Sequence, residues 1–282
     1  QMAIRDGRLE AARDDFRQAV DAARAKPDRT REFIALTGLA ESQIGLSELD
    51  GAEQNVAALR RIAPGSPITL KTSAKVHFAR QDYPAARGDL QKVLAANNDD
   101  ASALFLLGAV YLAEGDPDQA ELNLARAVNL APGNLAARKL LADAQLRRAD
   151  PAAAVEALSP LLESEAAPDL QTSYLASQAL FRTGETDQAI ELLEQSHASD
   201  PTNMDVAMSL GAGYLAQQRI DDAVALFESI PPGEDYRREL LLAVAYAARD
   251  ESDQAQAQID RILAENPDDN AALILVSEFY LA

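Results

Sequence analysis

The sequence predicts an all-α protein in which antiparallel helix pairs stack into a solenoid. A pattern of apolar and small residues recurs about every 34 residues along the 282-residue chain, and this period is typical of helix–turn–helix repeats. Proline, glycine and Asp or Asn recur where each expected helix begins or ends. Hydrophobic residues make up 48% of the chain but aromatic residues only 5%, and the abundant alanine and leucine favour helices.

The repeat is clearest between residues 101 and 134, and it can be aligned on one small residue in its second helix. That alignment residue is Ala52, Ala86, Ala120, Ala154, Ala189, Ala223 and Ala255. The alignment predicts seven full repeats, at 33–66, 67–100, 101–134, 135–169, 170–203, 204–235 and 236–269. We call the first helix of each repeat helix A and the second helix B, and we number positions from the first residue of the repeat.

Residues on either side of the full repeats continue the pattern incompletely. A half-repeat is expected at 1–26, an irregular joint at 27–32 and another half-repeat at 270–282. A second irregular joint is expected at 231–235, where the short repeat ends in Pro231-Pro232-Gly233. Because solenoids need polar terminal helices to cover their apolar ends, we expect one continuous solenoid that is part of a longer repeat protein.

Helix-capping and turn residues agree with this register. Asp116-Pro117 and Asp150-Pro151 place an N-cap before a proline in the first helical turn, where the missing N–H costs nothing. Gly115 and Gly184 fall in the turn between helices A and B, which favours a residue able to adopt positive φ.

Small residues at position 8, together with those at position 20, let the two helices of a repeat approach closely. The position-8 residues are Ala40, Ala74, Gly108, Ala142, Ser177, Gly211 and Ala243. This pattern resembles the tetratricopeptide repeat (TPR) family over essentially the whole chain, although position 4 is never tryptophan. The resemblance implies a right-handed superhelical solenoid. It also implies that helix-A positions 2, 5, 6, 9, 12 and 13 line a concave groove for partner peptides.

The sequence offers little for catalysis or metal binding. It contains no cysteine and only two histidines, His77 and His197, which are too far apart in sequence to suggest a zinc site. The glycines of Gly211-Ala212-Gly213 lie inside an expected helix, and Asn97–Asp100 lacks the spacing of a calcium loop. We therefore expect no enzymatic activity, no metal and no cofactor.

Acidic residues outnumber basic ones, 45 to 26, and give a net charge of −19. This charge disfavours nucleic acid as a partner and predicts a solvated acidic outer face; recruitment of a basic partner is the alternative. No apolar run is long enough for membrane insertion. The sequence leaves the oligomeric state open.

The implied groove is less acidic than the rest of the chain. Its charged members are six basic and four acidic residues, the latter being Glu41, Asp143, Asp205 and Glu278. We predict a mildly basic, partly apolar groove that binds a protein or peptide segment carrying acidic groups. The candidate contact residues are Lys71, Lys75, Phe78, Phe105, Lys139, Arg147, Tyr174, Gln178, Arg182 and Met208.

One stretch, from Ala137 to Arg147 and on to Leu162, resembles TPR lipoproteins of bacterial exopolysaccharide loci associated with PEP-CTERM protein sorting. That resemblance implies a periplasmic or membrane-tethered scaffold in envelope assembly or polysaccharide export. Two alternatives are a cytoplasmic adaptor or co-chaperone and the regulatory repeat region of a larger enzyme. The co-chaperone is disfavoured, because Lys75 and Leu106 stand where its carboxylate clamp needs asparagine.

Overall fold

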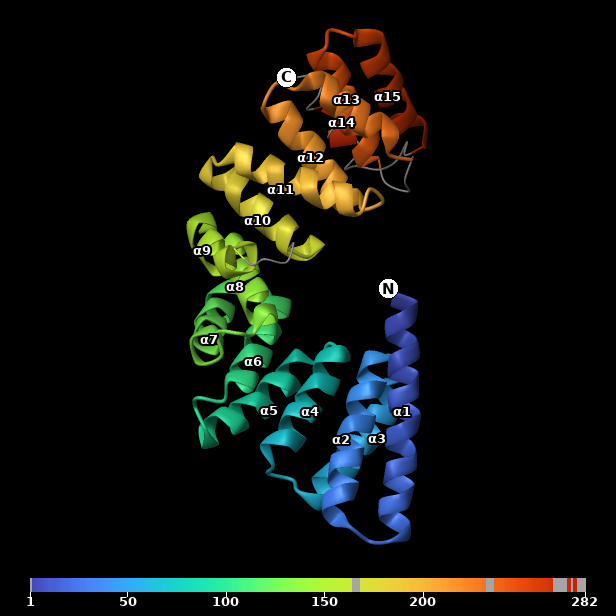
Figure 1. Ribbon diagram of the computed structural model, residues 1–282, viewed down its shortest axis with the longest axis vertical. Coiled ribbons are helices and arrows are strands. Elements are labelled where there is room, and N and C mark those ends of the chain that lie inside the picture. Colours follow the sequence, from blue (N-terminus) through green and yellow to red (C-terminus); the bar gives the residue numbers. More distant parts are fainter. Residues whose placement is uncertain (1, 164–167, 232–235, 266–272, 275, 278–282) are drawn as a thin grey trace. The chain divides into compact units, whose positions relative to one another are not determined.

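The computed structural model describes residues 2–163, 168–231, 236–265, 273–274 and 276–277 (Figure 1). These residues form fifteen α-helices, and none of the described residues belongs to a strand, so the all-α prediction is confirmed. The chain divides into two compact units, Gln1–Arg148 and Ala149–Ala282. We refer to them as unit 1 and unit 2 and describe each by itself.

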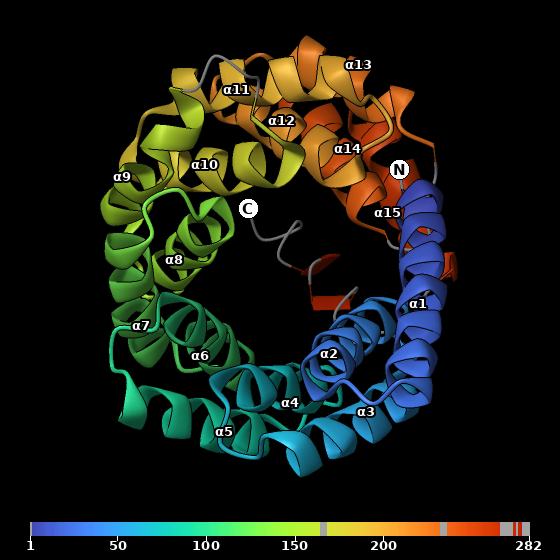
Figure 2. The same cartoon turned by 60° about the horizontal axis from the view of Figure 1, so that its bottom comes forward.

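Unit 1 consists of eight helices in two layers. They are α1 (Met2–Ala25), α2 (Arg29–Gly45), α3 (Leu49–Ile62), α4 (Pro67–Ala79), α5 (Tyr83–Ala96), α6 (Ala101–Glu114), α7 (Pro117–Leu130) and α8 (Leu135–Arg147). Figure 2 shows that α2, α4, α6 and α8, the helices A, form the inner layer of the unit. Each of α4, α6 and α8 packs against both helices of the preceding pair, so the inner layer is a continuous surface of helices A.

Unit 2 repeats this arrangement. Its helices are α9 (Pro151–Leu162), α10 (Leu170–Thr183), α11 (Thr186–Ser199), α12 (Met204–Ala216), α13 (Ile220–Ser229), α14 (Arg237–Ala248) and α15 (Ser252–Glu265). Helices α10, α12 and α14 are the helices A of this unit, and successive ones pack together. The predicted joint at 231–235, except Pro231, and most of the half-repeat 270–282 lie outside the described residues.

A large residue at position 24 of helix B packs against the small residue at position 8 of helix A. A Cβ on Gly108 would lie 2.4 Å from a side-chain carbon of Leu124, and one on Gly211 would lie 2.2 Å from the Phe227 ring. Leu124 and Phe227 are both completely buried. Close packing of this kind leaves no room for added carbon, so the size of the residue at position 24 limits the residue at position 8.

Every turn between helices A and B contains a left-handed residue at position 15. Gly115 and Gly184 have φ of 78° and 89°, in agreement with the turn prediction. The sequence did not reveal the other five residues, which are Ser47, Gln81, Ala149, Gln218 and Asp250, with φ from 58° to 63°. A left-handed conformation costs a non-glycine residue about 1–2 kcal/mol, and packing of the flanking helices must offset this strain.

The joint predicted at 27–32 is shorter in the structure. Helix α1 ends at Ala25 and α2 already begins at Arg29, so only three residues connect them. The cause is Asp28, whose carboxylate accepts hydrogen bonds from the backbone N–H groups of Thr30 and Arg31 at 3.1 and 3.0 Å. This N-cap starts the helix four residues earlier than the repeat register indicated.

Candidate protein-binding surface

An apolar cavity of about 430 Å³ lies on the helix-A surface of unit 1. It is lined by Ile44, Ala74, Lys75, Phe78, Ala79, Leu90, Phe105, Leu106, Ala109 and Val110. These residues come from α2, α4, α5 and α6, and we call the cavity the α4–α6 hollow. Its volume lies within the range of about 300–1,000 Å³ that is usual for ligand pockets.

Three of the predicted groove residues, Lys75, Phe78 and Phe105, meet in this hollow. The ring of Phe78 is 38% exposed and is held by Tyr83, with ring centroids 5.7 Å apart. Phe105 is half-buried. An exposed aromatic ring beside an open apolar cavity is the kind of feature that anchors a partner side chain.

The local sequence explains why the hollow is apolar and open. The groove positions of α6 carry no charge; they are Ser102, Phe105, Leu106, Ala109, Leu112 and Ala113. Alanines at 74, 79 and 109 leave space beside the two phenylalanines. Ile44, Leu106 and the alanines were not among the predicted contacts. The alanines were not recognisable because a cavity depends on small residues as much as on large or charged ones.

The basic residues near the hollow are paired with carboxylates. Lys75 Nζ lies 2.6 Å from Glu41 Oε1, and both residues occupy position 9 of adjacent repeats. On α8, Arg147 pairs with Asp143 at 3.0 Å. The positive charge predicted for the groove is therefore largely compensated in unit 1.

Lys71 has a second, structural role. Its Nζ lies 2.9 Å from Asp100, whose carboxylate also accepts the N–H of Ala103 at 2.8 Å and so caps α6. Burial opposes ionisation, but the hydrogen bonds from Lys71 and Ala103 hold the pKa of Asp100 below its usual value. Lys71 therefore helps to fix α6 in place, whereas the more exposed Lys75–Glu41 pair can exchange partners.

Below this surface, a buried carboxylate ties three helices together. Asp89 on α5 is 4% exposed; it accepts hydrogen bonds from Ser73 on α4 at 2.6 Å, Lys92 at 2.9 Å and Arg60 on α3 at 3.2 Å. Burial opposes ionisation, but Ser73, Lys92 and the Arg60 charge lower the pKa of Asp89. His77 Nε2 lies 3.9 Å from the same carboxylate, so His77 belongs to this structural network.

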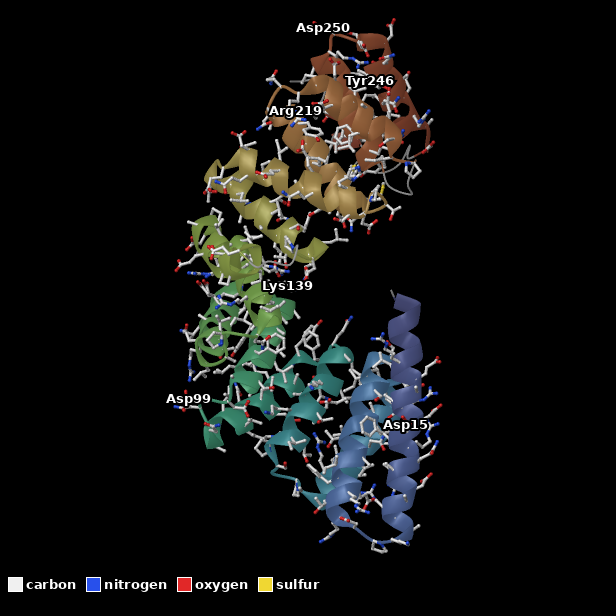
Figure 3. All side chains as sticks on the ribbon, in the orientation of Figure 1. Asp15, Asp99, Lys139, Arg219, Tyr246 and Asp250 are labelled. Atoms are coloured by element: carbon white, nitrogen blue, oxygen red, sulfur yellow. The ribbon has the colours of Figure 1, made fainter. Side chains whose placement is uncertain are left out.

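The remaining predicted groove residues are placed less favourably. Lys139 lies on α8 of unit 1 (Figure 3) and is half-buried. In unit 2, Tyr174 and Gln178 on α10 are half-buried, and Arg182 is exposed. The prediction that Met208 is a groove contact is wrong. Met208 is only 8% exposed and belongs to a core cluster with Phe227, Leu242 and Ala245, because the packing of α14 on α12 covers it.

The two units differ sharply in charge. Unit 1 carries 20 Lys and Arg against 20 Asp and Glu, whereas unit 2 carries 6 against 25. The whole net charge of −19 therefore belongs to unit 2. All five lysines of the chain lie in unit 1, and three of them are predicted groove residues.

Other features bear on chemistry and membranes. In the described part of the chain, no group of three or more His, Asp or Glu side chains is arranged to hold a metal ion. Among the described helices, none combines the length and the apolar character needed to cross a bilayer. The stacked helix pairs and the open apolar surface define a helical-repeat protein of the α-solenoid class.

Comparison with known families identifies this class. Family models described as tetratricopeptide repeat match residues 72–134, 111–176, 180–235 and 239–261. Together these matches span more than half of the chain, and the chain belongs to the tetratricopeptide repeat family. A search of curated protein sequences finds no match.

Solved structures confirm the fold. One chain of the Cut9–Hcn1 hetero-tetramer of the APC/C is 15% identical to this chain. The two align with a TM-score of 0.66 over 87% of this chain and 48% of that chain. This chain thus spans about half of that relative. PilW, a type IV pilus biogenesis factor, is 15% identical, with a TM-score of 0.65 over 74% and 98% of the two chains. A tetratricopeptide repeat protein from Parabacteroides merdae is 13% identical, with a TM-score of 0.62 over 88% and 98%.

Proposed function

We propose that this protein is a non-catalytic scaffold that binds a segment of a partner protein on the helix-A surface of unit 1. The α4–α6 hollow is the observation that carries the proposal. It is open, almost entirely apolar and about 430 Å³ in volume, and Phe78 and Phe105 stand at its walls. Tetratricopeptide repeats are in general interaction modules, and the family membership of this chain supports the same role.

The energetics of the surface favour an apolar anchor. Removing apolar area from water contributes about 25 cal/mol per Å², and a few anchor residues carry most of the affinity of an interface. The rigid helices around the hollow need little ordering on binding, which lowers the entropic cost of association.

We place this scaffold in the assembly or export machinery of the bacterial envelope, in the periplasm or tethered to a membrane. The support is the resemblance of the stretch between Ala137 and Leu162 to lipoproteins of exopolysaccharide loci. Fractionation of the source cells and protease treatment of spheroplasts test this location. Exposure of the protein to external protease is the expected result, and recovery in the cytoplasm contradicts the proposal.

Site-specific photo-crosslinking in intact source cells tests the binding role. A photoreactive phenylalanine analogue replaces Phe105 in the hollow in one variant. In a matched control it replaces Leu122, which is 58% exposed on α7 in the layer of helices B. We expect a discrete crosslinked protein from position 105 and none from position 122.

Two results contradict the proposal. One is the same crosslinked species from both positions, which indicates unspecific contact. The other is the absence of any crosslinked protein from position 105 while the variant keeps the helical circular dichroism of the parent chain.

A further inference from the structure

The geometry points to the chemistry of the partner: a segment with two neighbouring bulky apolar side chains and an adjacent carboxylate, bound in the α4–α6 hollow with the carboxylate on Lys75. This inference rests on the proposed function of unit 1 as a binding surface.

The size and lining of the hollow call for more than one apolar side chain. A volume of about 430 Å³ exceeds a single leucine or phenylalanine side chain. Its large apolar walls include Phe78 on α4 and Phe105 and Leu106 on α6. Because empty apolar space forfeits dispersion contacts, two neighbouring apolar groups fill the hollow better than one.

The charge of the adjacent group follows from Lys75. It is the only ionisable residue that lines the hollow, whereas Glu41, its partner at 2.6 Å, is not among the lining residues. An apolar segment in the hollow therefore lies beside the Lys75 side chain. A carboxylate beside the apolar pair reaches Lys75 directly and takes the place of Glu41.

The exchange of Lys75 from Glu41 to the partner costs little. The two side chains are 35% and 47% exposed, and exposed ion pairs contribute little to stability. Glu41 is rehydrated when the partner carboxylate replaces it. The other nearby lysine, Lys71, stays with the helix cap Asp100, so Lys75 is the cation available for recognition.

Selection from a random peptide library displayed on phage, on the full chain, tests the inference. We expect enriched peptides with two neighbouring bulky apolar residues beside Asp or Glu. A parallel selection on Ala109→Phe, which fills the hollow with a ring, should lose this motif while circular dichroism shows an unchanged fold. Enrichment of peptides with Lys or Arg beside the apolar pair overturns the inference, as does an absence of enrichment.

The affinity of one enriched peptide for variants of the chain, measured by fluorescence anisotropy, tests the role of Lys75, because two substitutions should change this affinity in opposite directions. Lys75→Met should weaken binding about three- to tenfold, and Glu41→Gln, which frees Lys75, should strengthen it about two- to threefold. Arg126→Gln on α7 is the matched control and should change nothing. Binding that Lys75→Met does not weaken, or that Glu41→Gln weakens, overturns the inference.

The outcomes separate this inference from the proposed function. If peptides are enriched equally on the parent chain and on Ala109→Phe, while photo-crosslinking from position 105 still captures a partner, the scaffold function stands and the peptide chemistry stated here fails. If crosslinking also fails, both fail.

Discussion

The helix pairs of unit 1 and unit 2 share one repeat pattern, yet unit 2 adds a second kind of polar link to the ion pairs that join successive repeats. In unit 1 the links are ion pairs. Arg80 reaches back to Asp50 at 2.5 Å and Glu53 at 2.9 Å, and Arg87 reaches forward to Glu114 at 2.6 Å. With 20 basic and 20 acidic residues, unit 1 has a basic group available for nearly every acidic one.

Unit 2 keeps ion pairs of this kind, from Arg219 to Glu194 at 3.1 Å and from Arg249 to Asp221 at 3.4 Å, and adds a tyrosine at position 11. Tyr214 donates to Glu194 of the preceding repeat at 2.9 Å, and Tyr246 donates to Glu228 at 2.7 Å. Arg219, just before α13, lies 4.1 Å from the Tyr214 ring centroid; Figure 3 labels both Arg219 and Tyr246. Burial and the bond to Glu194 raise the pKa of Tyr214 to about 12, so the phenol stays a neutral donor at physiological pH.

The comparison teaches that the apolar repeat positions determine the fold, whereas the polar links between repeats are interchangeable. Neutral tyrosine hydroxyls donate to carboxylates without adding positive charge, and unit 2 is strongly acidic, with 6 basic and 25 acidic residues. Unit 1 instead keeps its lysines and its neutral balance, and it carries the apolar hollow.

The largest effect is expected from emptying one core position in each unit. Phe227→Ala in unit 2 should cost about 3–5 kcal/mol and Leu90→Ala in unit 1 about 2–5 kcal/mol, because both side chains are completely buried and leave cavities. Hydrogen exchange by mass spectrometry should show faster exchange only in the unit that carries the substitution. Equally accelerated hydrogen exchange in both units contradicts their independent stability.

A smaller effect should follow from adding one methyl group at position 8. Gly211→Ala places a Cβ 2.2 Å from the Phe227 ring, and overpacking of this kind costs about 1–3 kcal/mol. Urea denaturation followed by circular dichroism measures the loss. The second substitution Phe227→Leu should recover part of it, since it recreates the alanine–leucine pairing of Ala74 and Leu90 in unit 1; no recovery argues against the packing rule.

The stability of unit 1 should depend on acidic pH through Asp89. The folded-state pKa of Asp89 is lowered, so its stabilising contribution is complete above about pH 4, near the unfolded pKa, and disappears as pH falls through the lower folded value. Asp89→Asn should cost about 1–3 kcal/mol at pH 7 and flatten the acid limb of unit 1 in hydrogen exchange. An unchanged acid limb contradicts the assignment.

Salt should act on the units in opposite directions. Raising NaCl from about 0.05 to 1 M screens charges beyond about 3 Å. This screening weakens the exposed ion pairs of unit 1 and relieves the self-repulsion of unit 2. We expect changes of about 1 kcal/mol or less per unit, with exchange faster in unit 1 and slower in unit 2. Changes of the same sign in both units contradict the electrostatic comparison.

The smallest effect is a gain. Gln81→Gly in unit 1 and Gln218→Gly in unit 2 relieve left-handed residues with φ of 63° and 60°. Each should stabilise its unit by up to about 1 kcal/mol, because relief of strain outweighs the added entropy of the unfolded chain. Thermal unfolding measures the gain. Gly115→Ala is the reverse control and should destabilise unit 1.

The sequence predicted the helices well and the surface only in part, for physical reasons. Helix ends depend on local capping and spacing, so Asp116 and Gly115 were readable from the sequence. Ser47 and Gln81 were not readable as left-handed residues, because tertiary packing imposes that conformation on ordinary side chains. The prediction for Met208 was wrong because its burial depends on how closely α14 packs on α12. Similarly, groove positions identified Lys75 but did not reveal that Glu41 already neutralises it.

Hydrogen exchange of the intact chain, with and without a peptide selected on it, tests the central claim most directly. We expect protection in α4 and α6 around the hollow, no change in α10, α12 and α14 of unit 2, and loss of the protection in Ala109→Phe. Protection confined to the acidic unit 2, or protection of α4 and α6 that persists in Ala109→Phe, contradicts the claim that the hollow of unit 1 is the binding site.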